Sequence, residues 1–247
     1  MSTPLAARVA TFRQQARALS VWGAAMCGVA LASGASAAYQ MRFAGGRSLE
    51  LVDLRALILA DSVALFTGIA VVLATVVGLA LYARFTRLAY TLAPELGVRG
   101  LSMSASRAAW GFALPVVMLW RPWRALSDLT RGLDAALATP RAPRAAADAS
   151  GHYRDNAAEA SAQGPALPPA PLGQAWALWW TGQALSLAIT LARPKVYSLS
   201  TTRDLLTLDV ASQLCVAGGA LLLGRVAAAL AARVDAVSKR VASEECP

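Results

Sequence analysis

"PVVMLWRPWRAL", residues 115–126, decides how many times this chain is expected to cross a membrane. The first five letters end an apolar run, residues 105–119, which rises only about 22 Å as an α-helix, whereas a bilayer core is about 30 Å thick. Pro115 also removes one internal hydrogen bond. The run therefore predicts a re-entrant or tilted half-helix that leaves the membrane on the side where it entered.

The residues after this run predict a second kind of helix, over 122–138. Pro122 suits the first turn of a helix, and large apolar residues then recur at spacings of three and four. This pattern is typical of an interfacial amphipathic helix, which we expect to lie on the cytoplasmic leaflet. The predicted apolar stripe consists of Trp123, Leu126, Leu129, Leu133 and Leu137.

Where the first predicted helix meets the second, tryptophan and arginine alternate. Tryptophan rings favour the headgroup level of a bilayer, and arginine pairs with phosphate. Trp120, Arg121, Trp123 and Arg124 therefore form a candidate site for lipid headgroups or another anion. A plain interfacial anchor without a bound ligand explains the same residues.

The composition of the chain is that of a membrane protein. Of its 247 residues 57% are hydrophobic and 15% are charged, against about 25% charged in an ordinary globular domain. We predict an all-α, polytopic membrane helix bundle with four full spans, the half-helix and the interfacial helix. The expected spans lie near 19–41, 56–82, 173–192 and 205–224.

Basic residues indicate the orientation. If 105–119 does not cross, seventeen Lys and Arg residues lie inside and six outside, with both termini cytoplasmic. If it does cross, a cytoplasmic N-terminus leaves ten inside and thirteen outside, which violates the positive-inside rule. A five-span chain with an outside N-terminus gives thirteen inside and ten outside, and it stays as the alternative.

The parts outside the spans have their own patterns. Residues 5–17 predict a slide helix on the membrane surface, and the stripe of valines and Leu230 after Arg225 predicts a cytoplasmic helix on which a partner helix docks. Residues 139–172 are rich in proline and alanine and predict a disordered cytoplasmic linker. This linker separates a first part of the bundle, 1–138, from a second part, 173–247.

The N-terminus has two interpretations. Arginines, an apolar run and the A-S-A triplet at 35–37 resemble a cleaved signal peptide. We favour an uncleaved first span, because about 23 apolar residues exceed the usual signal core.

Polar residues inside the predicted spans form a second candidate site. Acidic side chains there face the bundle interior or water and mark functional sites, or else they cap helix starts in the outer headgroup zone. Neighbouring amides and hydroxyls more often join helices than bind a solute. The candidates are Asp61, Asp209, Gln183 and Gln213.

Several segments together resemble a known family. "AAWGFALPVVMLWRPWRALSDL" and "QAWALWWTGQAL" are similar to a family of bacterial multi-span membrane proteins built on a domain of unknown function, over roughly 18–235. The sequence departs from the family pattern at Met118, where an Asn is usual, and at Trp123, where a Tyr is usual. The resemblance implies architecture and location and no activity. It rests on Trp110, Pro115, Leu119, Trp120, Arg121, Pro122, Trp176, Ala177, Leu178 and Trp179.

No catalytic motif, metal-ligand pattern or cofactor motif occurs in the sequence. The net charge of +9 is spread over the connections between spans, which disfavours nucleic acid as a partner. We therefore predict an integral protein of the bacterial inner membrane with a non-enzymatic interaction or regulatory role. Its expected partners are the bilayer, anionic lipids, and a second copy or another membrane protein. The alternative is small-solute or ion transport through a homo-oligomer that uses the two acids.

Overall fold

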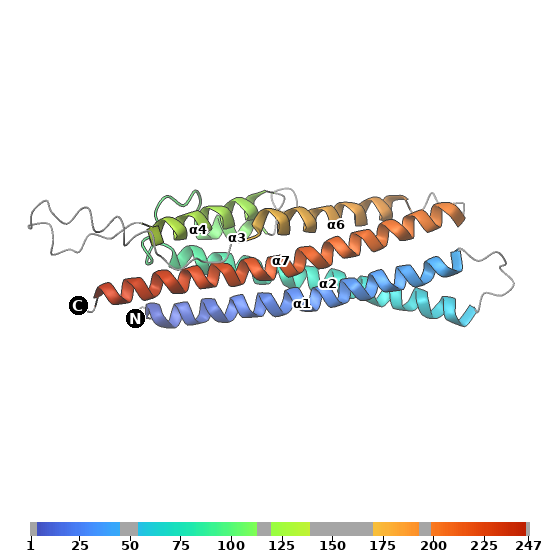
Figure 1. Ribbon diagram of the computed structural model, residues 1–247, viewed down its shortest axis with the longest axis horizontal. Helices are drawn as coiled ribbons and strands as arrows, with labels where there is room; N and C mark the ends of the chain where they lie inside the picture. The colour runs from blue at the N-terminus through green and yellow to red at the C-terminus, as the bar shows by residue number, and fades with distance from the viewer. Residues whose placement is uncertain (1–3, 45–53, 113–119, 139–169, 193–198, 246–247) are drawn as a thin grey trace, which may run out of the picture. The chain divides into compact units, whose positions relative to one another are not determined.

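The computed structural model describes residues 4–44, 54–112, 120–138, 170–192 and 199–245. These residues form helices joined by turns (Figure 1). The all-α prediction is confirmed, and three helices, α1, α2 and α7, are long and apolar enough to cross a membrane. The helices are α1 (Leu5–Ala44), α2 (Leu54–Leu92), α3 (Ala105–Trp110), α4 (Arg121–Ala138), α6 (Leu172–Ala192) and α7 (Leu199–Glu245).

The three longest helices exceed what a single crossing needs. They have 40, 39 and 47 residues, so each is about 60 to 70 Å long, twice the thickness of a bilayer core. The fourth predicted span, at 173–192, lies in α6, which has 21 residues and contains no Asp, Glu, Lys or Arg.

The chain divides into two compact units that share these long helices. Unit 1 contains residues 1–17, 81–170 and 226–247, and unit 2 contains residues 18–80 and 171–225. The helices α1, α2 and α7 therefore each contribute one part to unit 1 and another to unit 2.

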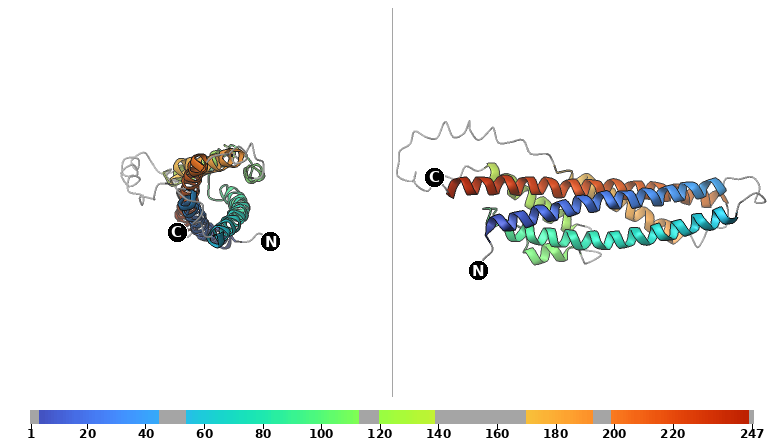
Figure 2. Two further views of the ribbon diagram at one scale, coloured as in Figure 1. Left: turned by 90° about the vertical axis from the view of Figure 1, so that its right-hand side faces the viewer. Right: turned by 90° about the horizontal axis from the view of Figure 1, so that it is seen from below.

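Unit 1 has a core of large side chains. Phe12 of α1 stacks on Phe85 of α2 with ring centroids 4.6 Å apart, and Tyr82 lies between Phe85 and Phe112 at 6.3 and 5.9 Å. The Tyr90 hydroxyl donates to the Ala125 carbonyl, 3.1 Å away, and so joins α2 to α4. Figure 2 shows the first turns of α1 beside the last turns of α7 within this unit. Further buried members of this core are Val9, Ala16, Ala89, Leu92, Leu126, Leu129, Leu133, Val226, Leu230, Val234, Val237 and Val241.

This core corrects three predictions about apolar stripes. The segment 5–17 is no separate slide helix, because α1 continues without interruption to Ala44 and buries Val9 and Phe12 in protein. The stripe of α4 is likewise covered by protein rather than lipid, since Leu126 and Leu129 are almost fully buried. The valine stripe of α7 is filled by the chain itself, which leaves no free face there for a partner helix.

The predicted half-helix, 105–119, is interrupted. The helix α3 ends at Trp110, and the Phe112 N–H donates to the Ala109 carbonyl at 3.1 Å, which closes a turn. Residues 113–119 lie outside the described residues, as does 139–169 of the predicted linker.

Unit 2 is held by close approach of backbones. A Cβ atom on Gly23 of α1 would lie 2.6 Å from the Ala220 carbonyl oxygen, and one on Gly219 of α7 would lie 2.7 Å from the Trp179 backbone nitrogen. Both distances are shorter than a carbon atom tolerates, so only glycine permits these contacts. Small residues at helix contacts are the usual packing device of membrane bundles.

Side-chain hydrogen bonds to backbone carbonyls add to this packing. Trp22 Nε1 donates to the Ala74 carbonyl at 2.8 Å, which joins α1 to α2. The fully buried Ser212 of α7 donates to the Gly182 carbonyl of α6, also at 2.8 Å. Such bonds satisfy polar groups that neither water nor lipid would satisfy.

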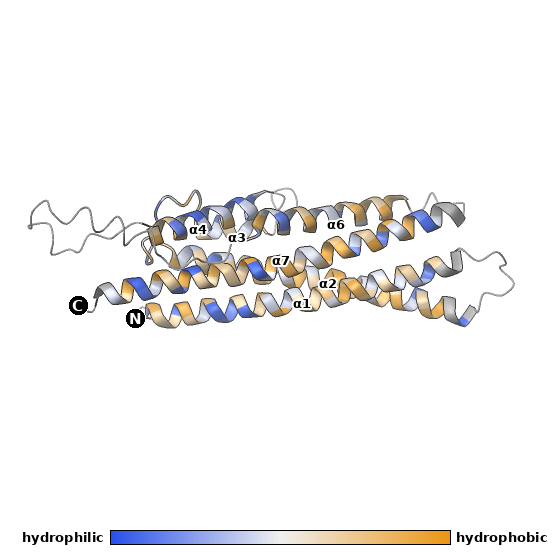
Figure 3. Cartoon of the chain, viewed as in Figure 1, coloured by the Kyte–Doolittle hydropathy of each residue, from blue (hydrophilic) through white to orange (hydrophobic). Residues whose placement is uncertain are grey.

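The part of α2 that belongs to unit 2 leaves most of its large apolar side chains exposed. Figure 3 shows the hydrophobic colour along this helix, and only 6% of its most apolar stretch is buried. A face of this composition would be unstable in water but is suited to lipid. The exposed residues are Ile58, Leu59, Val63, Leu65, Phe66, Ile69, Val72, Leu73, Val76 and Val77.

Candidate functional site

The end of α3 meets the start of α4 inside unit 1. Ser104 caps α3 by accepting a hydrogen bond from the Arg107 N–H at 3.4 Å, and Gly111 closes the helix. A Cβ atom on Gly111 would lie 3.2 Å from the Cβ of Arg121, so a larger residue would push the two helices apart. Gly111 thereby places Trp110 next to the first turn of α4.

Around this junction lies a surface of exposed aromatic and basic side chains. The exposed fractions of Trp110, Trp120 and Trp123 are 63%, 50% and 44%, and Arg121 and Arg124 are exposed as well. Exposure of three indole rings at the end of one helix and the start of the next is unusual for a surface that faces only water. We call these five residues the tryptophan–arginine surface.

The opposite face of α4 fixes this surface in place. Pro122, Ala125 and Leu126 are buried in unit 1, so Arg121, Trp123 and Arg124 must point outward. Trp123 was predicted to share the apolar stripe with Leu126, and this prediction is wrong. The stripe instead begins at Pro122, one residue earlier along the helix.

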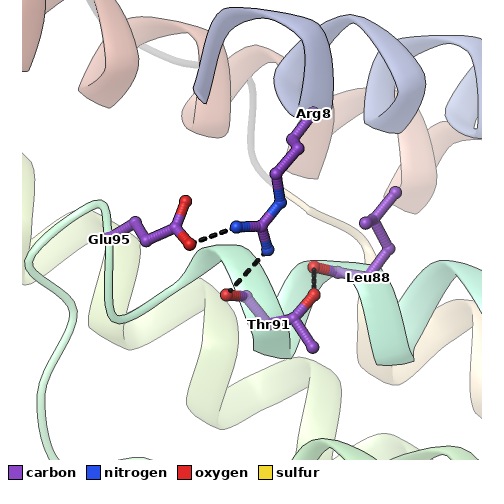
Figure 4. Close-up of polar contacts among 4 residues, drawn as sticks. All are labelled: Arg8, Leu88, Thr91 and Glu95. Atoms are coloured by element: carbon purple, nitrogen blue, oxygen red, sulfur yellow. Dashed lines mark hydrogen bonds and ion pairs between the residues drawn. The ribbon is translucent and has the colours of Figure 1, made fainter. Parts of the chain in front are cut away.

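Ion pairs hold the other helices of unit 1 together. Arg8 of α1 pairs with Glu95, and its second nitrogen donates to the Thr91 carbonyl at 3.2 Å (Figure 4). Arg13 pairs with Asp235 of α7, with Nη2 2.6 Å from Oδ1. Asp235 also pairs with Lys239, whose Nζ lies 3.6 Å from Oδ2. These pairs tie the first turns of α1 to the end of α2 and to α7.

The pair between α4 and α7 is the most buried one. Arg233 is 6% exposed and places its Nε 2.8 Å from Asp134 Oδ1, while its Nη1 donates to the Ala229 carbonyl. Arg240 donates to the Leu137 carbonyl at 2.6 Å, near the end of α4. A buried guanidinium is tolerated because its donors are occupied.

The predicted intramembrane acids lie within unit 2 and are bound by amides. The Gln40 side chain, near the end of α1, donates to Asp61 Oδ1 at 3.1 Å, and Asp61 is exposed. Asp209 is half-buried and accepts a hydrogen bond from Gln213 of its own helix at 3.4 Å. No contact that brings Asp61 and Asp209 together is observed among the described residues.

The two glutamines of the predicted site differ in burial. Gln213 is buried beside Gly34 of α1, and its Oε1 has no hydrogen-bond partner within the described part of the chain. Gln183 is half-buried in α6. The neighbour of Gln213 on α1 is of the kind found where polar side chains join helices.

Sequence reasoning missed two participants. Trp110 belongs to the apolar run and to the family resemblance but not to the predicted anion site, although the glycine that follows it is a signal for a close helix approach. Gln40 was not considered as a partner of Asp61, because the two residues belong to different helices and no local spacing relates them. Within the described residues no group of three or more His, Cys, Asp or Glu side chains is arranged to hold a metal.

Comparison with known proteins identifies a family for this chain. The family described as "domain of unknown function (DUF4328)" matches residues 48–232, about three quarters of the chain. No curated protein and no solved structure matches this chain. The match confirms the resemblance predicted from the tryptophan- and proline-containing segments, and the chain therefore belongs to the DUF4328 family.

Proposed function

We propose that this chain is an integral protein of the bacterial inner membrane, with unit 2 in the bilayer and unit 1 in the cytoplasm. In this proposal α1, α2, α6 and α7 each cross once, and both termini are cytoplasmic. The role is non-enzymatic: unit 2 anchors the protein, and unit 1 presents the tryptophan–arginine surface for interaction or regulation.

The observation that carries the proposal is the unequal distribution of basic residues between the units. Sixteen of the 23 Lys and Arg residues belong to unit 1, and the seven in unit 2 all lie outside the charge-free centres of its helices. Basic residues concentrate on the cytoplasmic side of membrane proteins. The units therefore have the charge expected of a cytoplasmic part and a membrane part.

Chain connectivity supports four crossings over five. Residues 81–170 all belong to unit 1, together with both ends of the chain, and this stretch includes 105–119. Unit 2 then consists of two stretches, 18–80 and 171–225, each of which starts and ends at unit 1. Two helical hairpins, each crossing out and back, satisfy this connectivity.

Transport through the bundle has weaker support. An ion pathway needs acidic groups that are free to face one another or a wet cavity. Asp61 is instead bound by Gln40 close to the end of α1, and Asp209 by Gln213. These contacts do not amount to capping either, because Asp61 lies seven residues after Leu54, where α2 begins, and Asp209 ten residues after Leu199, where α7 begins. Transport would additionally require a homo-oligomer.

Labelling of single cysteines tests the arrangement. In a variant without the native cysteines, Arg131→Cys and Ala242→Cys place exposed thiols in unit 1, and Asp204→Cys places one in unit 2. A membrane-impermeant maleimide added to spheroplasts should label position 204 alone. Added to inverted vesicles, it should label positions 131 and 242 but not 204. A fourth variant, Arg99→Cys, places an exposed thiol before residue 105 in unit 1, and the proposal expects its labelling from the inside. Labelling of 99 from outside together with 131 and 242 from inside would instead establish the five-span arrangement with an outside N-terminus.

A further inference from the structure

The acidic side chains of unit 1 that the structure describes already have partners. Glu95 pairs with Arg8, Asp134 with Arg233 and Asp235 with Arg13. Asp128 accepts a hydrogen bond from Ser102. These four are the acids of unit 1 whose side-chain surroundings the structure describes.

A second set of arginines in unit 1 makes no ion pair within the described residues. Its members are exposed and, except for one, lie between the end of α2 and the middle of α4. Arginines that carry the ion pairs come from α1 and α7, so the two sets come from different parts of the sequence. The unpaired set is Arg17, Arg84, Arg87, Arg99, Arg107, Arg121, Arg124 and Arg131.

The tryptophan–arginine surface is the part of this positive region that also carries exposed indole rings. Tryptophan rings partition to the headgroup level of a bilayer, and a guanidinium forms paired hydrogen bonds with a phosphate. The neighbouring sequence "ALPVVML", residues 113–119, is entirely apolar and leads directly into Trp120. In the sequence, apolar, aromatic and basic residues thus follow one another directly.

We propose that the tryptophan–arginine surface binds the phosphate groups of anionic phospholipids in the leaflet next to unit 1. Arg121 and Arg124 pair with phosphates, and Trp110, Trp120 and Trp123 enter the headgroup zone. Charge complementarity selects this occupant, because three of the four described acids of unit 1 are paired with arginine while eight exposed arginines have no ion pair among the described residues. The inference rests on the proposed cytoplasmic location of unit 1.

Retention of lipid by the purified full-length protein tests this assignment. Phosphatidylglycerol or phosphatidylcholine is titrated into detergent solution, and the lipid-bound fraction is measured by native mass spectrometry. Each arginine near an anionic surface changes binding by about five-fold, so Arg121→Gln with Arg124→Gln should weaken phosphatidylglycerol retention by about thirty-fold. Phosphatidylcholine retention should be unchanged.

Arg84→Gln with Arg87→Gln is the matched control. Both residues are exposed and unpaired in unit 1, so the pair removes the same charge from α2 while leaving the tryptophan–arginine surface intact. Trp120→Ala with Trp123→Ala, in a protein that keeps all its arginines, should also weaken phosphatidylglycerol retention. Circular dichroism of each variant reports whether the helices are intact.

Three results would overturn the inference. Equal losses in both arginine pairs would mean diffuse attraction without a site, and unchanged retention would mean that lipid does not bind there. If the Arg121→Gln, Arg124→Gln variant retains phosphatidylglycerol but loses binding to a short RNA, the surface binds a different anion. If cysteine labelling still places unit 1 in the cytoplasm, these failures leave the proposed function standing.

Discussion

The two units are built from the same long helices but are stabilised by different interactions. In unit 1, large side chains are buried and arginines pair with acids, as between Phe12 and Phe85 or Arg233 and Asp134. In unit 2, glycines allow backbones to touch while large apolar side chains remain exposed, as at Gly219 and Phe66.

This difference indicates two solvents. In water, exposure of apolar surface is unfavourable, so a helix buries its apolar stripe against protein. In lipid that driving force is absent between helices, and packing depends on close approach and hydrogen bonds. The helix α2 passes from one behaviour to the other, from exposed Val76 and Val77 to buried Tyr82 and Phe85.

Replacing a core aromatic residue should have the largest effect. Phe12→Ala removes a fully buried ring that stacks on Phe85, and it should destabilise the protein by about 3 to 5 kcal/mol. Phe66→Ala is the control, because Phe66 is 70% exposed in unit 2 and its ring contacts little protein. Thermal unfolding in detergent, followed by circular dichroism, measures both. Similar losses at the two positions would break the comparison.

Enlarging a glycine tests the packing of unit 2. Gly219→Val places carbon atoms against the Trp179 backbone and should cost about 1 to 3 kcal/mol through forced separation of α6 and α7. Gly28→Val carries the same chemical change at a position with open space. The unfolding midpoint in a denaturing detergent should fall for Gly219→Val alone, and an equal fall for Gly28→Val would argue against close packing as the cause.

Breaking the buried ion pair should give unequal results from its two ends. Asp134→Ala removes the carboxylate from the buried guanidinium of Arg233, whereas Arg233→Met leaves only a half-exposed carboxylate, which water can solvate. We expect a cost of about 1 to 3 kcal/mol for Asp134→Ala and a smaller cost for Arg233→Met. Chemical unfolding of the two variants gives the order, and the reverse order would contradict the burial of Arg233.

A single hydrogen bond in unit 2 should matter least. Ser212→Ala removes the donor to the Gly182 carbonyl and should cost about 0.6 kcal/mol, the average for such bonds in membrane bundles. Thr190→Ala is a control, because the exposed Thr190 hydroxyl bonds only within its own helix. Paired unfolding curves in the same detergent resolve the difference, and a loss above that of Gly219→Val would mean that polar contacts dominate unit 2.

Much of the fold follows from the sequence, since charge-free runs predict membrane-length helices whatever their neighbours are. The apolar stripes at Val9, Leu126 and Leu230 were also located correctly. Their environment was not, because periodicity shows that a face avoids water and says nothing about what covers it. Three stripes assigned to lipid or to a partner instead form one core.

The candidate site, too, is only partly predictable from the sequence. Residue type and position alone point to Arg121 and Arg124, and both side chains are exposed, while their binding of an anion stays a prediction. The outward position of Trp123 depends on which neighbours bury Pro122, and the addition of Trp110 depends on a contact through Gly111. Such tertiary contacts join residues about ten positions apart, and no local rule of spacing predicts them.

Spin labels along α2 test the central claim most directly, because this one helix belongs to both units. In the reconstituted protein, labels at exposed positions should meet lipid-soluble oxygen at Leu73 and Val76 and a water-soluble nickel chelate at Arg84 and Arg87. The change in accessibility should fall between residues 77 and 84. Oxygen accessibility that persists through Arg87, or nickel accessibility at Leu73, would contradict the assignment of the two units to two solvents.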